Sequence, residues 1–111
     1  MTIKKLLISN RGEIASRIIK SAHDMGITCV AIYTEADKNT PYVREADQSF
    51  KLSDSYLNAK EILEIAKKNN VDAIHPGYGF LSENANFANN VKKAGIKWVG
   101  PSANAIKKMG D

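Results

Sequence analysis

The stretch 75–84 carries the residue types best suited to contact another molecule. It reads His-Pro-Gly-Tyr-Gly-Phe-Leu-Ser-Glu-Asn. Pro76, Gly77 and Gly79 predict a fixed loop, and the two glycines let its backbone approach a ligand closely. His75, which ends the preceding predicted strand, is interpreted as a structural histidine whose hydrogen bonds are satisfied.

The same loop brings two aromatic rings, Tyr78 and Phe80, to a segment where they need not belong to the core. Ser82 or Glu83 is expected to open the next helix, whose free backbone amides would point back toward the loop. The residues alone leave two interpretations open. The loop is either a rigid turn with both rings tucked beneath it, or one wall of a site for a flat, partly polar ligand.

A second candidate is the turn 9–14, Ser-Asn-Arg-Gly-Glu-Ile, between the first predicted strand and the first predicted helix. Dinucleotide-binding domains carry G-x-G-x-x-G at this place, whereas only Gly12 is present here. Asn10 and Glu13 have the spacing of a capping box, with Asn in place of Ser or Thr. Because the Glu13 carboxylate would repel a pyrophosphate, a capped helix start is favoured over a dinucleotide site.

The remaining ionisable side chains indicate no catalytic or metal centre. Glu35 and Asp37 stand where a ribose-binding acid is expected, but without the glycines they are interpreted as turn residues. His23 lies late in a predicted helix, and Cys29 lies in a predicted strand as a small buried hydrophobe. No His, Cys, Asp or Glu cluster has metal-ligand spacing, so no metal site is predicted in this chain.

The composition is that of one soluble globular domain, with 111 residues, 43% hydrophobic and 25% charged. The net charge of +4 comes from scattered lysines without interleaved aromatic residues, which makes nucleic acid an unexpected partner. Cys29 is the single cysteine, which excludes an internal disulfide and fits a reducing compartment. The apolar run 6–8 is too short for a signal-peptide core or a membrane span, so a cytoplasmic location without membrane contact is predicted.

Short apolar runs alternate with helical periods along the chain, which favours an α/β fold with a parallel sheet. The predicted strands are 3–9, 27–33, 48–52, 71–75 and 96–99, and the predicted helices are 12–25, 58–69, 83–94 and 102–109, with a single turn at 43–46. Ligands of such sheets bind at the carboxyl ends of the strands. The loops expected at that edge are 10–12, 34–40, 75–81 and 100–102.

At these residues the chain resembles the biotin carboxylases, and the resemblance covers its whole length. The run 75–85 is the most specific part, because related ATP-grasp ligases begin with similar folds. The other matching segments are 10–15 with Arg17-Ile18, Ala46-Asp47, 55–57, Gly100-Pro101 and 109–111.

The resemblance implies the N-terminal, pre-ATP-grasp domain of a ligase that uses MgATP and bicarbonate to carboxylate biotin on a carrier protein, through carboxyphosphate. It implies a Rossmann-like three-layer sandwich of about five parallel strands. The partners it implies are a biotin carboxyl carrier protein, a carboxyltransferase and a second copy in a homodimer. The family's ATP-grasp and C-terminal domains lie beyond Asp111, so this chain alone is expected to be inactive and to self-associate or be marginally stable.

Residue by residue, the resemblance places Tyr78 and Gly79 beside biotin and Glu83 near the same pocket. It assigns Arg17, Lys20 and Asp24 to the homodimer surface. Family members commonly have Arg and Glu where this chain has Lys20 and Asp24, and lysine lacks the bidentate fork of arginine. Two alternatives stay open, another ATP-grasp ligase with a different acceptor and a standalone nucleotide-binding or interaction module.

Overall fold

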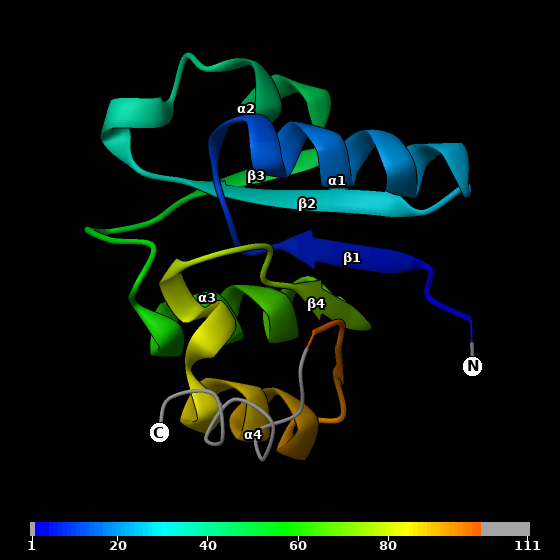
Figure 1. Ribbon diagram of the computed structural model, residues 1–111, viewed down its shortest axis with the longest axis vertical. Helices are drawn as coiled ribbons and strands as arrows, with labels where there is room; N and C mark the ends of the chain where they lie inside the picture. The colour runs from blue at the N-terminus through cyan, green and yellow to red at the C-terminus, as the bar shows by residue number, and fades with distance from the viewer. Residues whose placement is uncertain (1, 101–111) are drawn as a thin grey trace.

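Five parallel strands form one sheet. Figure 1 shows the strands β1 to β4 at the centre of the molecule, with helices around them. The computed structural model describes residues 2–100. The strand order across the sheet is β3-β2-β1-β4-β5, so the chain builds outward from β1 to β3 and then returns to the other side of β1. The strands are β1 (Lys5–Ile8), β2 (Thr28–Tyr33), β3 (Gln48–Lys51), β4 (Ala73–His75) and β5 (Lys97–Trp98). The predicted α/β class and five-stranded parallel sheet are confirmed.

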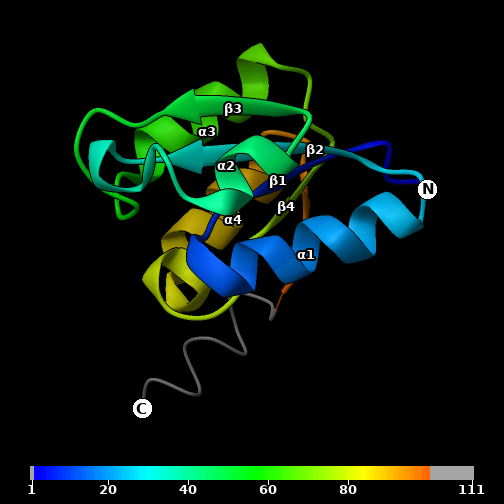
Figure 2. The same ribbon diagram turned by 90° about the horizontal axis from the view of Figure 1, so that it is seen from above.

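Helices cover both faces of this sheet, which confirms the three-layer architecture. The helices are α1 (Gly12–Asp24), α2 (Pro41–Glu45), α3 (Ala59–Lys68) and α4 (Ala85–Lys93), with 3-10 turns η1 (Glu35–Asp37) and η2 (Phe80–Glu83). Helices α1 and α2 pack on one face and α3 and α4 on the other. Figure 2 shows α1 running alongside the strands.

The apolar run of β1 explains why two helical layers are needed. Leu6 and Ile8 point into the core beneath α1, whereas Leu7 points into the core beneath α3 and α4. A strand that is apolar on both faces is stable only where both faces are covered. All three side chains are at most 5% exposed.

Side-chain caps set the starts of α3 and α4. Asn58 accepts a hydrogen bond from the Glu61 amide, and Asn84 accepts one from the Phe87 amide. The prediction that Ser82 or Glu83 opens a helix spanning 83–94 is therefore wrong at its start. The segment Phe80–Glu83 forms a separate 3-10 turn, and α4 begins only after Asn84.

Other boundaries differ from the predicted ones by a few residues. The turn predicted at 43–46 is helix α2, which starts at Pro41, where a proline's missing N–H costs nothing. The predicted helix 102–109 and the end of the predicted loop 100–102 lie outside the described residues. Within residues 2–100, no helix is long and apolar enough to cross a membrane.

Candidate functional site

The carboxyl ends of β1 and β4 meet where the direction of sheet building reverses. The connection after β1 leads to β2, whereas β4 is added on the opposite side of β1. The two loops that follow β1 and β4 therefore lie at the switch point of the sheet, where open parallel sheets usually bind ligands. Both sequence candidates, the turn 9–14 and the stretch 75–84, lie at this edge.

Asn10 joins the loop after β1 to the loop after β4. Its side chain is 1% exposed, and its Nδ2 donates hydrogen bonds to the carbonyl oxygens of Pro76 at 2.8 Å and Tyr78 at 2.7 Å. Its Oδ1 accepts a hydrogen bond from the Arg11 amide at 2.8 Å. Both amide donors of Asn10 are thus used to hold the loop after β4.

The predicted capping role of Asn10 and Glu13 is wrong. Arg11 occupies the N-cap position of α1 without a side-chain cap hydrogen bond, and Glu13 is exposed in the first turn. The physical reason lies in the partners of Asn10. The carbonyls of Pro76 and Tyr78 lose contact with water on folding, so they need a hydrogen-bond donor from the protein. Leaving them unpaired would cost more folding free energy than leaving the partly solvated start of α1 uncapped.

Backbone conformation explains the two loop glycines differently. Gly77 has φ of +62°, and a Cβ added there would stand 2.6 Å from Asn10 Nδ2. Gly79 has φ of +69° and ψ of −165°, a region that side chains exclude, although a Cβ there would meet nothing within 4 Å. Position 77 therefore requires glycine because Asn10 packs closely against it. Position 79 requires glycine because of its backbone conformation, although the space around it is open.

The two aromatic rings of this loop have different surroundings. Tyr78 is 79% exposed, so it is not tucked beneath the loop. Phe80 is 41% exposed and packs against Tyr56, with ring centroids 5.3 Å apart. The structure thus keeps one ring of the loop free and anchors the other on the core.

His75 contacts the backbone of its own loop. Its Nδ1 accepts a hydrogen bond from the Gly77 amide at 3.2 Å, which ties the strand end to the loop. Burial lowers the pKa of His75, so its imidazole is neutral near pH 7.

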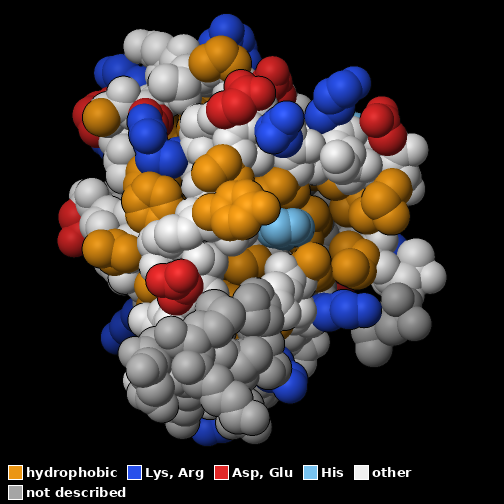
Figure 3. Space-filling model, viewed as in Figure 1, with side chains coloured by type: hydrophobic (Ala, Val, Ile, Leu, Met, Phe, Trp, Pro, Cys, Tyr) orange, Lys and Arg blue, Asp and Glu red, His pale blue; other side chains and the backbone are white. Residues whose placement is uncertain are grey.

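His75 also borders an apolar groove, which is lined by the side chains of Ile18, Met25 and Val99 among others. Figure 3 shows hydrophobic side chains gathered around a histidine on one face of the molecule.

A charge network fixes the neighbouring loop, which follows β2. Arg11 binds the Asp37 carboxylate through two hydrogen bonds of 2.6 and 2.7 Å, and Tyr56 donates a third at 2.6 Å. Tyr42 and Tyr56 share a hydrogen bond of 2.6 Å between their hydroxyls. The Arg11 guanidinium, helped by the Tyr56 hydroxyl, lowers the pKa of Asp37 against the opposing effect of burial. Asp37 lies in the predicted turn, but the sequence did not reveal that it is a buried ion-pair partner.

The remaining predicted site residues lie on the surface. Glu83 is exposed at the end of η2. Arg17, Lys20 and Asp24 are exposed on α1 and line one groove of about 730 Å³ between α1 and α2. The fold thus places the three predicted dimer residues on a common surface.

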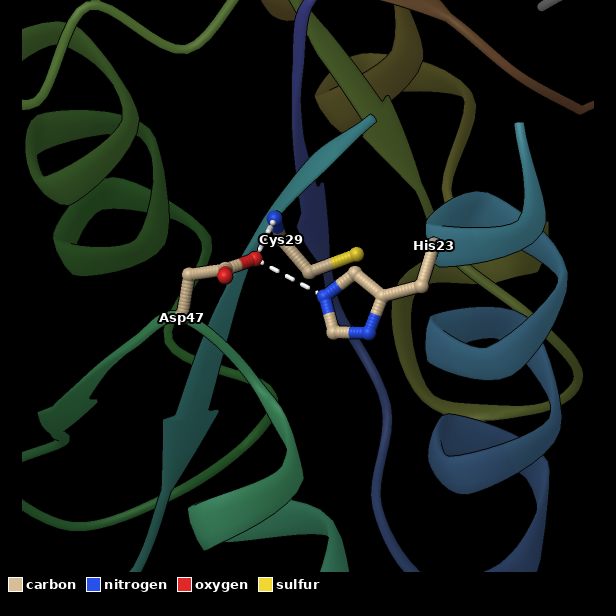
Figure 4. Close-up of side chains that lie close together, drawn as sticks. All are labelled: His23, Cys29 and Asp47. Carbon is tan, nitrogen blue, oxygen red and sulfur yellow. Dashed lines mark hydrogen bonds and ion pairs between the residues drawn. The ribbon is translucent and has the colours of Figure 1, made fainter. Parts of the chain in front are cut away.

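The fold also brings together a set of metal-ligating side chains that the sequence analysis did not find. His23, Cys29 and Asp47 come from α1, β2 and the residue before β3 (Figure 4). Their ligand atoms all lie within 4.8 Å of one another. Because Asp47 is 18 residues from Cys29 and 24 from His23, no short-range spacing could have revealed the cluster.

Comparison with known proteins identifies the family. Residues 2–106 match the family described as the biotin carboxylase N-terminal domain. The chain is 54% identical to biotin carboxylase 1 of Bacillus subtilis, covering 97% of this chain and 25% of that protein. It is 44% identical to human mitochondrial pyruvate carboxylase, covering 98% of this chain and 10% of that protein.

A solved relative has the same fold. The biotin carboxylase domain of Hydrogenobacter thermophilus 2-oxoglutarate carboxylase, crystallised as a dimer with MgADP, ADP and bicarbonate, matches with a TM-score of 0.96 at 43% identity. The match covers 100% of this chain and 25% of that one. The chain therefore spans a quarter or less of the length of these relatives. On sequence and fold together, the chain belongs to the family of biotin carboxylase N-terminal domains.

Proposed function

We propose that the protein carrying this chain is a biotin carboxylase, a ligase that uses MgATP and bicarbonate to carboxylate biotin held on a carrier protein. Family membership and 43–54% identity to biotin carboxylases and biotin-dependent carboxylases support this proposal. Its partners are then a biotin carboxyl carrier protein, a carboxyltransferase and a second copy of itself. ATP-grasp and C-terminal domains supply the ATP and Mg²⁺ sites, and the compartment is the cytoplasm.

Within that enzyme, the part of this chain is to form one wall of the biotin site and to present a dimer surface. The observation that carries the wall is the exposed ring of Tyr78, held on a backbone that Asn10 fixes at Pro76 and at Tyr78 itself. Because the backbone at Tyr78 is already fixed, less conformational entropy is lost when the flat apolar face of the ring contacts a ligand. The open space beside Gly79 leaves room for a flat bicyclic ligand to approach the backbone.

No group in this chain is assigned a bond-making step. Bound MgATP and bicarbonate supply the activated carboxyl group, and this chain's residues position its acceptor. His75 is neutral and already accepts the Gly77 amide, so its role is to shape the loop. Glu83 stands at the end of the same segment and is proposed to lie near the acceptor pocket. The isolated chain is accordingly proposed to be inactive.

The test measures bicarbonate-dependent ATP hydrolysis, with and without free biotin, in the full-length protein. We expect Tyr78→Ala to raise the KM for biotin by about tenfold, which corresponds to the contact of one aromatic face, and to change the KM for ATP less than twofold. Tyr78→Phe keeps the ring and should behave as the wild type. Leu57→Ala, at another exposed large side chain, is the matched control.

Two results would count against the proposal in different ways. Equal losses for biotin and ATP in Tyr78→Ala would overturn the pocket-wall role while leaving the enzyme intact. A full-length wild-type protein that hydrolyses ATP with amine or carbamate acceptors, and not with biotin, would instead identify a different ATP-grasp ligase.

A further inference from the structure

The cluster of His23, Cys29 and Asp47 lies at the opposite end of the sheet from the loops described above. Cys29 is the second residue of β2, Asp47 immediately precedes β3, and His23 lies in the last turn of α1. This is the amino-terminal edge of the parallel strands. Figure 4 shows the three side chains converging from three separate elements. The cluster is therefore unrelated to the proposed biotin site.

Existing contacts already fix much of this cluster. Asp47 Oδ2 accepts a hydrogen bond from the Cys29 amide at 2.7 Å and lies 2.8 Å from His23 Nε2. The Cys29 thiol is buried, and its sulfur lies 3.8 Å from the Ile27 carbonyl and 4.0 Å from the Ile19 carbonyl. The His23 and Asp47 side chains are 39% and 46% exposed. A solute can therefore reach the cluster from the surface, with the thiol at its inner end.

From this arrangement we propose that His23 Nε2, Cys29 Sγ and a carboxylate oxygen of Asp47 form a binding site for a borderline divalent cation, Zn²⁺, with water as the fourth ligand. One imidazole, one thiolate and one carboxylate are the donors that Zn²⁺ prefers. Mg²⁺ selects oxygen ligands and octahedral geometry, so this site is distinct in kind from one for MgATP.

The distances suit a tetrahedral ion after small side-chain movements. Zinc bonds of ordinary length require about 3.3 Å between the nitrogen and oxygen ligands and about 3.6 Å between sulfur and either of them. The nitrogen and oxygen now lie 2.8 Å apart, and every pair of ligand atoms lies within 4.8 Å. Because His23 and Asp47 are partly exposed, each can shift without disturbing the core, while the buried Cys29 stays in place.

The charge balance also favours a divalent ion. Asp47 supplies a carboxylate, and Cys29 binds a metal ion only after its thiol has lost the proton. Binding replaces the S–H bond with a sulfur–metal bond and releases that proton to solvent. A thiolate, a carboxylate and a neutral imidazole then neutralise the two positive charges of the ion.

The bound ion would tie the end of α1 to the amino-terminal edge of β2 and β3. The expected consequence is stabilisation of the fold, because an ion that binds only the folded state shifts the unfolding equilibrium. No catalytic step is assigned to it. Metal binding should therefore raise the melting temperature without being required for the carboxylase reaction.

The experiment uses the full-length protein after a chelator has removed bound metal. The protein is then titrated with Co²⁺, a spectroscopic probe for Zn²⁺ sites. We expect a thiolate-to-cobalt charge-transfer band in the near ultraviolet, visible d–d bands of a tetrahedral ion, and displacement of both by Zn²⁺. The band should be absent in Cys29→Ala. His23→Gln, at a partly exposed position that should not affect folding, should weaken cobalt binding at least tenfold.

Matched controls separate this site from others in the same protein. His75→Gln changes the other histidine of the chain, and Asp24→Asn removes the exposed carboxylate next to His23. Both variants should bind cobalt within twofold of the wild type. The proposal is overturned if the wild type gives no band beyond that of Cys29→Ala, or if His23→Gln binds cobalt as tightly as the wild type.

Discussion

Asn10 and Gly77 lie so close that no residue larger than glycine fits at position 77. The Cβ of an alanine there would stand 2.6 Å from Asn10 Nδ2 and 3.0 Å from a methyl carbon of Ile14. The same Asn10 amide nitrogen donates to the carbonyls on either side of Gly77. The loop after β4 is therefore shaped by one buried side chain from the loop after β1.

Substituting Gly77 should lower the free energy of unfolding more than substituting a glycine that has a similar φ but no close neighbours. We expect Gly77→Ala to reduce the free energy of unfolding by about 2–5 kcal/mol, from left-handed strain plus overpacking. Gly26→Ala, at φ of +77° with no atom within 4 Å of its Cβ, should cost only about 1–2 kcal/mol. Urea unfolding measures both. If both variants lost a similar amount of unfolding free energy, close packing of Asn10 against position 77 would not be the reason that glycine is needed there.

The ion pair of Arg11 with Asp37 should stabilise the fold in a pH-dependent way. Because the folded-state pKa of Asp37 lies below its unfolded value, the pair stabilises above roughly pH 4, and this stability is lost as the pH falls through the folded-state pKa. Arg11→Gln should cost about 1–3 kcal/mol at pH 7, reduced from the value for a fully buried pair because the Arg11 side chain is 48% exposed.

The pH comparison provides the check for this pair. Urea unfolding of wild type and Arg11→Gln at pH 7 and near pH 3 should show the difference shrinking in acid. Arg44→Gln removes an exposed arginine whose guanidinium donates a hydrogen bond to the Asn39 carbonyl, and it should cost less than about 0.5 kcal/mol of unfolding free energy at either pH. A difference between wild type and Arg11→Gln that stays constant with pH would show that Asp37 is not the partner that matters.

Local patterns in the sequence were enough to predict the layers of this fold. The apolar run of β1 and the helical spacing of Ile19 and Ala22 depend on near neighbours, and both faces of the sheet are covered as expected. The predicted helix 12–25 ends one residue beyond the observed α1, and Gly26, with positive φ, follows the cap residue Met25.

Local patterns did not reveal the contacts in which a distant partner decides the role of a polar residue. Asn10 has cap spacing, but its amide instead bonds carbonyls 66 and 68 residues away. Asp37 reads as a turn residue until Arg11 and Tyr56 surround it. The cluster around Cys29 needs three elements to meet at one sheet edge. None of these contacts leaves a periodic trace in the sequence, so only the fold reveals them.

The apolar groove beside His75 should make the isolated chain self-associate. Met25, which lines this groove, is 75% exposed, and exposed apolar patches of soluble proteins commonly bind other surfaces. We expect sedimentation velocity to show concentration-dependent association of the wild-type chain and a shift toward monomer in Met25→Lys. Leu57→Lys adds the same charge at an exposed leucine outside the groove and should leave association unchanged. A wild-type chain that stays monomeric at every concentration would contradict this expectation.

Lys20 allows the proposed dimer surface to be tested in the full-length protein. It is exposed on α1 and lines the same groove as Arg17 and Asp24. Lys20→Arg should tighten the proposed dimer, because a guanidinium can bind a carboxylate of the second copy with two hydrogen bonds, whereas an ammonium group cannot. Lys20→Glu should weaken the dimer by about fivefold or more, since an exposed ion pair is worth up to about 1 kcal/mol and reversing the charge adds repulsion.

Lys60→Glu is the matched control. It changes the net charge equally but lies on α3, on the other side of the sheet, so the dimer dissociation constant of this variant should match that of the wild type. If Lys60→Glu weakened the dimer as much as Lys20→Glu, net charge rather than this face of α1 would govern dimer formation.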